Sequence, residues 1–337
     1  MAEPLLEVKD LKVHFPTEDG LVKAVDGVSF SISPGETLGV VGESGSGKSV
    51  SFLTVMGLIN RKSAHVSGEV IFRGQDLLKL PADEMRNIRG SKISMIFQDP
   101  MTSLHPYYKV GYQISEAIRA HQKVSKKEAW AESVEMLRRV GIPKPAERAD
   151  QFPHEFSGGM RQRAMIAMAL SLNPDLLIAD EPTTALDVTV QAQILHLIDR
   201  LKEEFDAAVV IITHDLGVVA EHCDDIMVMY AGRPVETGER NDIYYDAQHP
   251  YTWGLLRSIA RLDMDRQTRL EPIKGLPPSL IFVPRGCPFH PRCPYVMDVC
   301  KTETPPLLPG AGRHASACHL TLAEKERTFH DEVLVTE

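Results

Sequence analysis

The chain has 337 residues, of which 25% are charged and 43% hydrophobic, the composition of a folded globular protein with one large domain or one large and one small. Its net charge of −9, without any block of lysine and arginine, argues against a protein that coats nucleic acid. No apolar stretch approaches the length of a membrane-spanning helix, and the first residues do not form a secretory signal. We therefore expect a cytoplasmic chain whose five cysteines are thiols or metal ligands rather than disulfides.

The N-terminal segment predicts strands followed by a phosphate-binding loop. Residues 5–15 and 22–32 alternate apolar and polar side chains, which predicts two antiparallel strands with a turn near residues 18–20. The apolar run 37–41 predicts a buried strand, and residues 42–49 then fit the pattern G-x-x-x-x-G-K-[ST]. A glycine-rich surface turn would explain neither the preceding strand nor the Lys-Ser pair. The octet therefore predicts nucleotide binding.

Each part of this octet has an expected role. Its glycines let the backbone N–H groups point at a polyphosphate, and the helix that opens near Gly47 directs its positive end at the same anion. We expect Lys48 to reach the β- and γ-phosphates and the Ser49 hydroxyl to complete a Mg²⁺ shell. The residues expected to bind the nucleotide here are Gly42, Ser44, Gly45, Ser46, Gly47, Lys48 and Ser49.

Strands and helices alternate through the middle of the chain. Residues 70–72 and 93–97 predict strands, and residues 111–140 have the spacing of an amphipathic helical block inserted between two α/β stretches. A helix from about residue 158, a strand at 176–179, a helix at about 188–205 and a strand at 208–212 follow. This order predicts an α/β protein with a mainly parallel sheet that is covered on both faces.

The strand at 176–179 ends in two carboxylates, Asp180 and Glu181. We expect this strand to neighbour the strand of the phosphate loop, and Asp180 to hold Mg²⁺ directly or through water. Glu181 points differently and is placed to accept a proton from the attacking water. A strand that merely runs into an acidic turn is the alternative, and the phosphate loop makes it less favourable.

Ser157, Gly158 and Gly159 stand at an expected helix start, where the serine hydroxyl and free N–H groups would form a second anion-binding site. An ordinary helix cap is the alternative for these residues alone. In this position the segment resembles the signature of ABC transporter ATPases, usually Leu-Ser-Gly-Gly-Gln, with Phe156 and Met160 replacing the outer two residues. The resemblance implies an ABC-type P-loop ATPase with an N-terminal antiparallel β subdomain, a mainly parallel core sheet and a helical insertion at about residues 100–160.

Further elements of that family occur in the expected order. The resemblance implies that Gln98 senses the γ-phosphate and Mg²⁺, and that His214 contacts the γ-phosphate. Asp187, in the segment 185–187, corresponds to the loop through which two ATPase halves touch, and Phe15 to the aromatic residue that stacks on adenine. Mg²⁺ would thus have Ser49, Gln98 and Asp180 as its ligands. The family also implies that ATP is sandwiched between the phosphate loop of one subunit and the signature of another, so the chain would form half of a head-to-tail pair.

Motifs outside the core narrow the resemblance to oligopeptide and dipeptide importers. These motifs are residues 98–104, 181–189 and 249–252, and together they are most similar to the D-type ATPase subunit. The resemblance implies a heterodimer with a second ATPase, two membrane permeases and an extracytoplasmic peptide-binding protein, with this chain at the cytoplasmic face of the plasma (inner) membrane. It implies no nucleic-acid partner. Nickel importers use similar ATPases, so the cargo stays open.

The C-terminal part changes in character. Residues 226–230 and 234–237 suggest a hairpin, and residues 272–309 then hold 10 of the 23 prolines, too many for long helices or central strands. We expect an ATPase domain at 1–248 and an extension with a four-cysteine metal site at 249–337. Its proline-rich segment is expected to be loop-rich and to lack apolar mass. Cys223, before this extension, is expected to be a buried core residue.

Four cysteines in this extension have the spacing C-x5-C-x6-C-x17-C. They are Cys287, Cys293, Cys300 and Cys318. Their spacing is wider than that of the close pairs usual for zinc, whereas a [4Fe–4S] cluster needs four thiolates without such a rule. The resemblance to peptide-importer ATPases favours the cluster over zinc, and four unligated thiols are the third possibility. His290, His314 and His319 are nearby as alternative ligands.

Two other functions fit parts of the sequence. A soluble ABC ATPase of translation or DNA repair would share the cassette, but such proteins generally carry two cassettes or a long coiled coil, and this chain has neither. A metal- or redox-sensing module in which ATP is regulatory would account for the cysteines.

Overall fold

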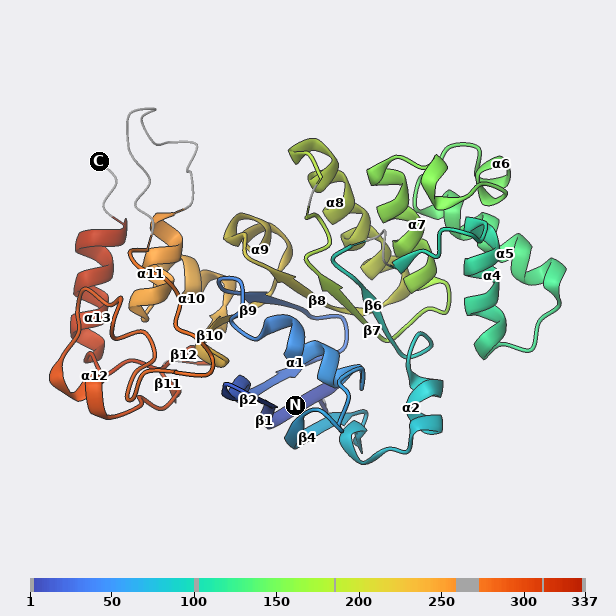
Figure 1. The fold of residues 1–337 in the computed structure, drawn as a ribbon. Coiled ribbons are helices and arrows are strands. Elements are labelled where there is room, and N and C mark those ends of the chain that lie inside the picture. The colour runs from blue at the N-terminus through green and yellow to red at the C-terminus, as the bar shows by residue number, and fades with distance from the viewer. Residues whose placement is uncertain (1–2, 100–102, 185, 259–272, 311, 335–337) are drawn as a thin grey trace.

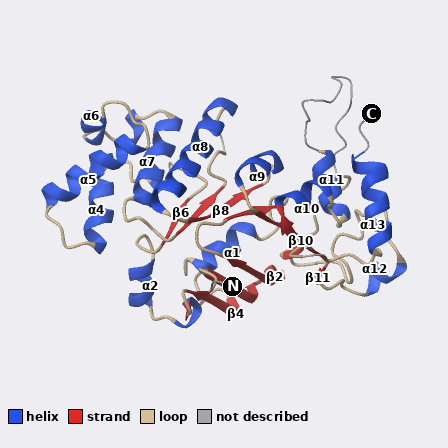
Figure 2. Cartoon of the chain, turned by 180° about the vertical axis from the view of Figure 1, so that it is seen from behind, coloured by secondary structure: helices blue, strands red, loops and turns tan. Residues whose placement is uncertain are grey.

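The computed structural model describes residues 3–99, 103–184, 186–258, 273–310 and 312–334. Within them the chain forms a small antiparallel sheet, a larger mixed sheet and helices around both (Figure 1). A helical block, α4 to α7, lies at one end of the molecule and the C-terminal helices lie at the other, and the view from behind shows the same division (Figure 2). The predicted α/β fold class is confirmed.

The small sheet contains the predicted N-terminal strand pair. Its strands follow the order β2-β1-β4-β5. They are β1 (Leu6–Thr17), β2 (Gly20–Ile32), β4 (His65–Phe72) and β5 (Gln75–Asp76). β1 and β2 pair antiparallel from Leu6↔Ile32 to Thr17↔Gly20, which confirms the expected turn. Alternate side chains such as Val13 and Val25 are fully buried, because one face of this sheet covers the core.

The larger sheet has the order β11-β12-β10-β9-β3-β8-β7-β6. Its strands are β3 (Thr37–Val41), β6 (Ile93–Ile96), β7 (Leu176–Asp180), β8 (Ala208–Thr213), β9 (Asp225–Tyr230), β10 (Arg233–Glu239), β11 (Leu308–Pro309) and β12 (Ala315–Ser316). The five strands β9, β3, β8, β7 and β6 are parallel, and β10 turns back against β9 as the predicted hairpin.

Both faces of the parallel strands are buried, as predicted. In β8, Val210 and Ile212 join one apolar cluster while Val209 and Ile211 join the other. The first cluster lies against the antiparallel sheet and α1 (Lys48–Val55), which contributes Phe52. Strands buried on two faces need continuous apolar sequence, which explains why these runs do not alternate.

The helices beyond α1 are α2 (Ala82–Ile88), α4 (Val110–His121), α5 (Lys126–Arg139), α6 (Pro145–Ala149), α7 (Gly158–Leu170), α8 (Val188–Phe205), α9 (Leu216–His222), α10 (Arg240–Tyr245), α11 (Pro250–Arg257), α12 (Asp298–Thr302) and α13 (Leu322–Phe329). The block expected at 111–140 is two helices, because Ser125 and Glu128 form a capping box that starts α5. No helix within the described ranges is long and apolar enough to span a membrane.

The C-terminal extension shares its core with the ATPase part. β12 pairs with β10 and continues the larger sheet. Trp253, Phe289 and Phe329 are nearly fully buried in the same apolar cluster as Tyr230 of β9. The expectation that the proline-rich segment 272–309 lacks apolar mass is wrong, because its Phe289 is buried. Trp253 and Phe329, on either side of that segment, also hold the extension on the sheet, and the three aromatic residues are spaced too irregularly to show a period. The domain division at residue 248 stays a proposal.

Arg313 of the extension also faces two carboxylates on the ATPase part. Its Nη2 lies 3.0 Å from Asp225 Oδ2, and its Nη1 lies 3.4 Å from Glu36 Oε1. Burial, the hydrogen bond with Glu36 and the charge of Glu36 raise the pKa of Asp225 to about 7. This pKa is above the ordinary value of about 3.9 for an unfolded chain, so protonated Asp225 stabilises the fold at low pH. That contribution is lost as the pH rises through about 7.

We therefore expect Asp225→Asn to gain stability relative to the parent chain as the pH rises from 5 to 8. The gain should be about 1 to 2 kcal/mol, because part of the shift is shared with Glu36. Urea unfolding of both chains at several pH values measures it. Asp83→Asn, which changes a carboxylate that is 87% exposed, is the control. Parallel stability curves for Asp225→Asn and the parent chain would contradict the expectation.

Candidate nucleotide-binding site

The phosphate loop connects β3 to α1 with three glycines in left-handed or related backbone conformations. Gly42, Gly45 and Gly47 have φ values of 151°, 77° and 99°. A Cβ on Gly42 would lie 2.2 Å from the carbonyl oxygen of Met229, and a Cβ on Gly47 would lie 2.2 Å from that of Ala24. Only glycine fits at these two positions, since the clash is with backbone atoms.

Lys48 lies inside this loop. Its Nζ donates to the carbonyl oxygens of Gly42 (2.7 Å) and Glu43 (3.0 Å), with Ser46 Oγ at 3.5 Å. The residue is 5% exposed, and burial lowers its pKa. Nearby carboxylates, Glu181 first, oppose this lowering. The loop thus holds a buried ammonium group among its own carbonyl groups, where an anionic ligand can replace those partners.

Ser49 and Asp180 meet across the site. Ser49 Oγ donates to Asp180 Oδ1 at 2.9 Å. Burial raises the pKa of Asp180, and the hydrogen bond from Ser49 opposes this. A hydroxyl and a carboxylate oxygen are ligands that Mg²⁺ accepts, so these residues fit the expected ion. The expectation that β7 neighbours the strand of the phosphate loop is wrong, because β8 lies between β3 and β7. Asp180 still reaches Ser49 since both strands end at the same edge of the sheet.

The side chain of Glu181 contacts polar groups from three different segments. Its Oε2 accepts from Gln98 Nε2 at 3.0 Å and from Thr184 Oγ1 at 2.9 Å, and His214 Nδ1 lies 3.4 Å from Oε1. Its backbone φ of 45° is unusual for a residue with a side chain, and its N–H donates to Ile212 O at 2.8 Å. Such local strain occurs at sites where the surrounding structure fixes a functional group.

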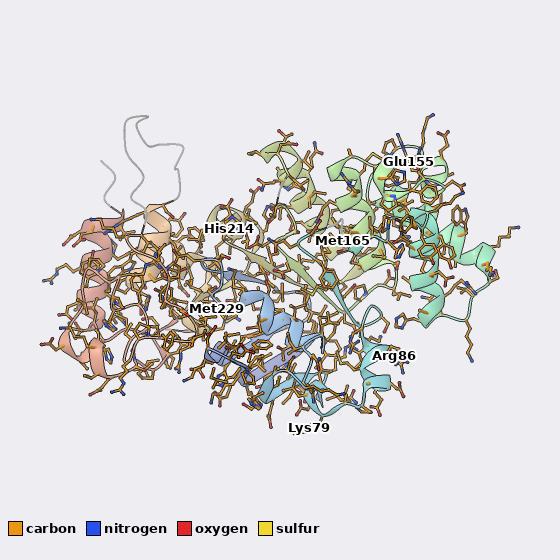
Figure 3. The ribbon with its side chains drawn as sticks, viewed as in Figure 1. Lys79, Arg86, Glu155, Met165, His214 and Met229 are labelled. Carbon is orange, nitrogen blue, oxygen red and sulfur yellow. The ribbon has the colours of Figure 1, made fainter. Side chains whose placement is uncertain are left out.

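The site therefore joins residues at the ends of four strands, and its Lys48 and Ser49 lie in the loop and helix that follow β3. Gln98 follows β6 and His214, labelled in Figure 3, follows β8, and both side chains are exposed. Asp180 is the last residue of β7, and Glu181 follows it. The structure brings together Lys48, Ser49, Gln98, Asp180, Glu181 and His214. Their roles as base, sensor and ligand stay proposals.

The segment Ser157-Gly158-Gly159 forms a separate exposed feature at the start of α7. Ser157 is the N-cap, and its Oγ accepts from Met160 N at 3.3 Å. Asp187 caps α8 in the same way, accepting from Val190 N at 3.0 Å. Gly159 lies beside Val190, so the two helix starts are neighbours. Gly158 lies beside Leu186, just before α8, so this segment faces the start of that helix.

A buried hydrogen bond connects α7 to the residue that follows Glu181. Gln162 Nε2, on α7, donates to Pro182 O at 2.6 Å.

Phe15 is half-buried on β1 opposite Val22, in the sheet that packs against α1. Ala185 and residues 100–102, which belong to the predicted motifs, lie outside the described residues.

Sequence reasoning missed three residues that contact the site. Thr184 donates to Glu181, and the hydroxyl of Tyr251 and the guanidinium of Arg292 contact Glu43 in the phosphate loop. Thr184 lies in the motif at residues 181–189, three positions after Glu181, so the sequence did indicate that these two residues are close. No spacing in the sequence indicates that residue 292 contacts residue 43.

The four C-terminal cysteines line one cavity of about 20 Å³, together with His290 and His319. Burial raises the pKa of Cys287 to about 11 and that of Cys293 to about 12. Among the residues that the structure describes, no group of three or more His, Cys, Asp or Glu side chains is arranged to hold a metal ion. The donor chemistry suits a metal group, but a cavity of this size holds about one water molecule. The cysteines would have to move apart to admit a cluster, so the metal site stays a prediction.

The other residues near this region have separate partners. His314 lies outside the cysteine cavity, where its Nε2 is 2.9 Å from Glu236 Oε1. His290 and His319 each contact a backbone carbonyl group, that of Cys287 and that of Glu303. Cys223, which follows α9, is 1% exposed, and the prediction that it is a buried core residue is confirmed.

Two family models match the chain. The ABC transporter model matches residues 25–184, and the model for the oligopeptide/dipeptide transporter C-terminal region matches residues 235–300. The oligopeptide transport ATP-binding protein OppD of Escherichia coli (strain K12) is 54% identical over 304 residues, 90% of each chain. The dipeptide transport ATP-binding protein DppD of Bacillus subtilis (strain 168) is 54% identical over 319 residues, covering 94% of this chain and 95% of the relative. The chain belongs to the family of oligopeptide and dipeptide ABC transporter ATP-binding proteins.

Solved structures of ABC ATPases have the same fold. One is a dimeric ATP-binding cassette in a post-hydrolysis state with ADP and Pi, which has a TM-score of 0.63 and 28% sequence identity. The match covers 70% of this chain and 98% of the cassette. The cbiO1 protein of Clostridium perfringens has a TM-score of 0.62 and 28% identity, covering 73% and 92%. The sequence relatives and the two family models confirm the expected resemblance to peptide-importer ATPases.

Proposed function

We propose that this chain binds MgATP and hydrolyses it to drive the uptake of oligopeptides or dipeptides through membrane permease subunits. The observation that carries the proposal is the cluster of Lys48, Ser49, Asp180 and Glu181 at one edge of the core sheet. Ser49 and Asp180 are 2.9 Å apart, and Glu181 is held by Gln98 and Thr184. Membership of the peptide-transport ATPase family supports ATP hydrolysis coupled to transport, and this cluster is where we place that reaction.

Each residue of the cluster has a part in the proposed reaction. Lys48 and the N–H groups of the loop bind the phosphates, and Ser49, Asp180 and Gln98 hold Mg²⁺. When bound, Mg²⁺ neutralises negative charge on the phosphate oxygens. Glu181 accepts a proton from the attacking water, His214 contacts the γ-phosphate, and Phe15 stacks on adenine.

We further propose that the functional unit is a head-to-tail pair of ATPase subunits, a heterodimer with a second chain. Ser157, Gly158 and Gly159 are exposed or half-exposed at a helix start, where their N–H groups can bind the phosphates held by the partner's loop. Asp187, beside this helix start, would lie in the contact between the two subunits. Closure on ATP and reopening after hydrolysis would then shift the populations of two states.

Two permeases and an extracytoplasmic peptide-binding protein would complete the importer, with this chain attached to the cytoplasmic face of the plasma membrane. Affinity purification of the tagged chain from solubilised membranes tests this assembly. We expect two permeases and a second ATPase in the complex, and ATP hydrolysis that rises when peptide-loaded binding protein is added. Recovery of ribosomes or DNA in place of membrane proteins would contradict the importer assignment.

For the cysteines we propose a [4Fe–4S] cluster held by Cys287, Cys293, Cys300 and Cys318, with zinc as the alternative. The support is that all four side chains line one cavity. A cluster needs more room than the present volume of about 20 Å³. We therefore assign no step of the ATPase reaction to it.

An assay of iron, sulfide and the visible spectrum tests the cluster in anaerobically purified protein. We expect a brown protein that loses its colour in Cys300→Ala and keeps it in Cys223→Ala, which changes a buried cysteine outside the cavity. A colourless protein loaded with zinc would refute the cluster.

A further inference from the structure

The second residue of the phosphate loop, Glu43, is held from behind by the C-terminal extension. We infer that Arg292 and Tyr251 are positioning residues that keep the phosphate loop in the shape that binds nucleotide. The inference rests on the proposed ATP site, and it gives the C-terminal extension a role in the affinity for ATP. Neither residue lies in the 42–49 motif or in the strand ends that form the rest of the site.

The side chain of Glu43 forms a two-pronged ion pair with Arg292. Arg292 Nη1 lies 2.5 Å from Glu43 Oε2, and Nη2 lies 3.0 Å from Oε1. The Arg292 side chain is 5% exposed and that of Glu43 is 28% exposed. A bidentate, largely buried pair of this kind fixes orientation as well as distance, and a single charge on lysine would not reproduce it.

The backbone of Glu43 is fixed at the same time. Its N–H donates to the hydroxyl oxygen of Tyr251 at 2.8 Å, and the carbonyl oxygen of the same peptide group, that of Gly42, accepts from Lys48 Nζ at 2.7 Å. Tyr251 lies in α11 and is fully buried. The extension therefore sets the orientation of a peptide unit to which the phosphate-binding lysine is bonded.

Arg292 is itself held in one position by its surroundings. Its Nε donates to Lys274 O at 3.0 Å, and Nη2 also donates to Gly275 O at 3.3 Å. Its guanidinium carbon lies 5.8 Å from the ring centre of Tyr230 and 5.9 Å from that of Phe289. These contacts fix the arginine before any ligand binds, so it can act as a rigid anchor.

The middle of the loop lacks such support. Ser44 and Gly45 are exposed, and a Cβ on Gly45 would have no atom within 4 Å. Anchoring Glu43 thus limits the conformations of a loop whose middle is unpacked, and a preformed loop loses less entropy when it closes on ATP. Glu181, Gln98 and His214 do not depend on this anchor. Its loss should therefore raise Kd and KM for ATP more than it lowers kcat.

The test uses the full chain and MgATP, with Kd from calorimetry and KM and kcat from phosphate release. We expect Arg292→Met to raise Kd about tenfold and Tyr251→Phe about threefold, with kcat at saturating ATP within about twofold. The double variant Glu43→Gln, Arg292→Met should have the same Kd for ATP as Arg292→Met alone, because both changes remove the same interaction. Arg292→Lys should recover only part of the affinity.

The extension offers matched controls. Arg257 pairs with Glu332 and contacts Tyr295. Arg257→Met and Tyr295→Phe therefore remove a guanidinium group and a tyrosine hydroxyl that do not contact the phosphate loop. Both controls should keep the ATP affinity of the parent chain.

Three outcomes contradict the inference or its basis. Unchanged Kd in Tyr251→Phe and Arg292→Met would overturn the inference, and so would equal losses in the controls, which would show a general effect on folding. If Arg292→Met does not fold, Tyr251→Phe decides, since it removes one oxygen and leaves no large cavity. A parent chain that does not bind MgATP would instead refute the proposed function.

Discussion

Glu181→Gln is expected to lower ATP turnover by about 10² to 10⁴-fold while MgATP still binds. The amide has the shape of the carboxylate but cannot accept the proton of the attacking water. We propose Glu181 for that role; its side chain accepts hydrogen bonds from Gln98 and Thr184 at 3.0 and 2.9 Å, and its backbone φ is 45°. Binding should persist because Lys48, Ser49 and the loop N–H groups are unchanged.

Single-turnover hydrolysis and calorimetry with MgATP measure the two parts of this prediction. The variant should accumulate the ATP-bound closed pair, which size-exclusion chromatography detects as an increase in the dimer. Glu221→Gln, on the exposed surface of α9, is the control and should hydrolyse ATP at the parent rate. Hydrolysis at the parent rate in Glu181→Gln would remove Glu181 as the base.

Gly47→Ala is expected to abolish MgATP binding and to lower the free energy of unfolding by about 3 kcal/mol. Gly47 has a φ of 99°, and an added Cβ would lie 2.2 Å from the carbonyl oxygen of Ala24 in β2. The clash is with a backbone atom, so a side-chain rotation cannot relieve it. The loop would have to move away from β2, which displaces both Lys48 and the start of α1.

Gly45→Ala separates backbone strain from this clash. Gly45 also has a positive φ, 77°, but an added Cβ would meet no atom within 4 Å. We expect this variant to lose only about 1 kcal/mol and to keep measurable ATP binding. Urea unfolding and calorimetry compare the two variants. Equal losses at both positions would show that the conformation of the loop matters and the contact with β2 does not.

The aromatic residues of the C-terminal extension change how its stability is explained. The cysteine spacing predicts a small fold stapled by metal, because the proline-rich sequence shows no apolar period. In the structure Trp253, Phe289 and Phe329 pack into the cluster beneath the larger sheet. β12 also pairs with β10, so the extension has a substantial apolar attachment whether or not the cysteines bind a metal.

Local sequence alone determined the phosphate loop, the buried strands and their acidic end. The octet 42–49 has fixed spacing, and strands buried on two faces require the continuous apolar runs of β3, β7 and β8. The capping box at Ser125 is equally local, and its signal explains why the expected helical block is two helices. Such features depend on residues within a few positions of one another, so pattern and spacing suffice to find them.

Only the tertiary structure decided which distant segments meet. The insertion of β8 between β3 and β7 depends on which strands pair, and their apolar sequences are too similar to indicate it. The contact of Arg292 with Glu43 joins residues 249 positions apart, and it exists because the extension packs against the end of β9 beside the loop. The sequence thus determined the chemistry of the phosphate loop, whereas the packing of the whole chain decided what supports it.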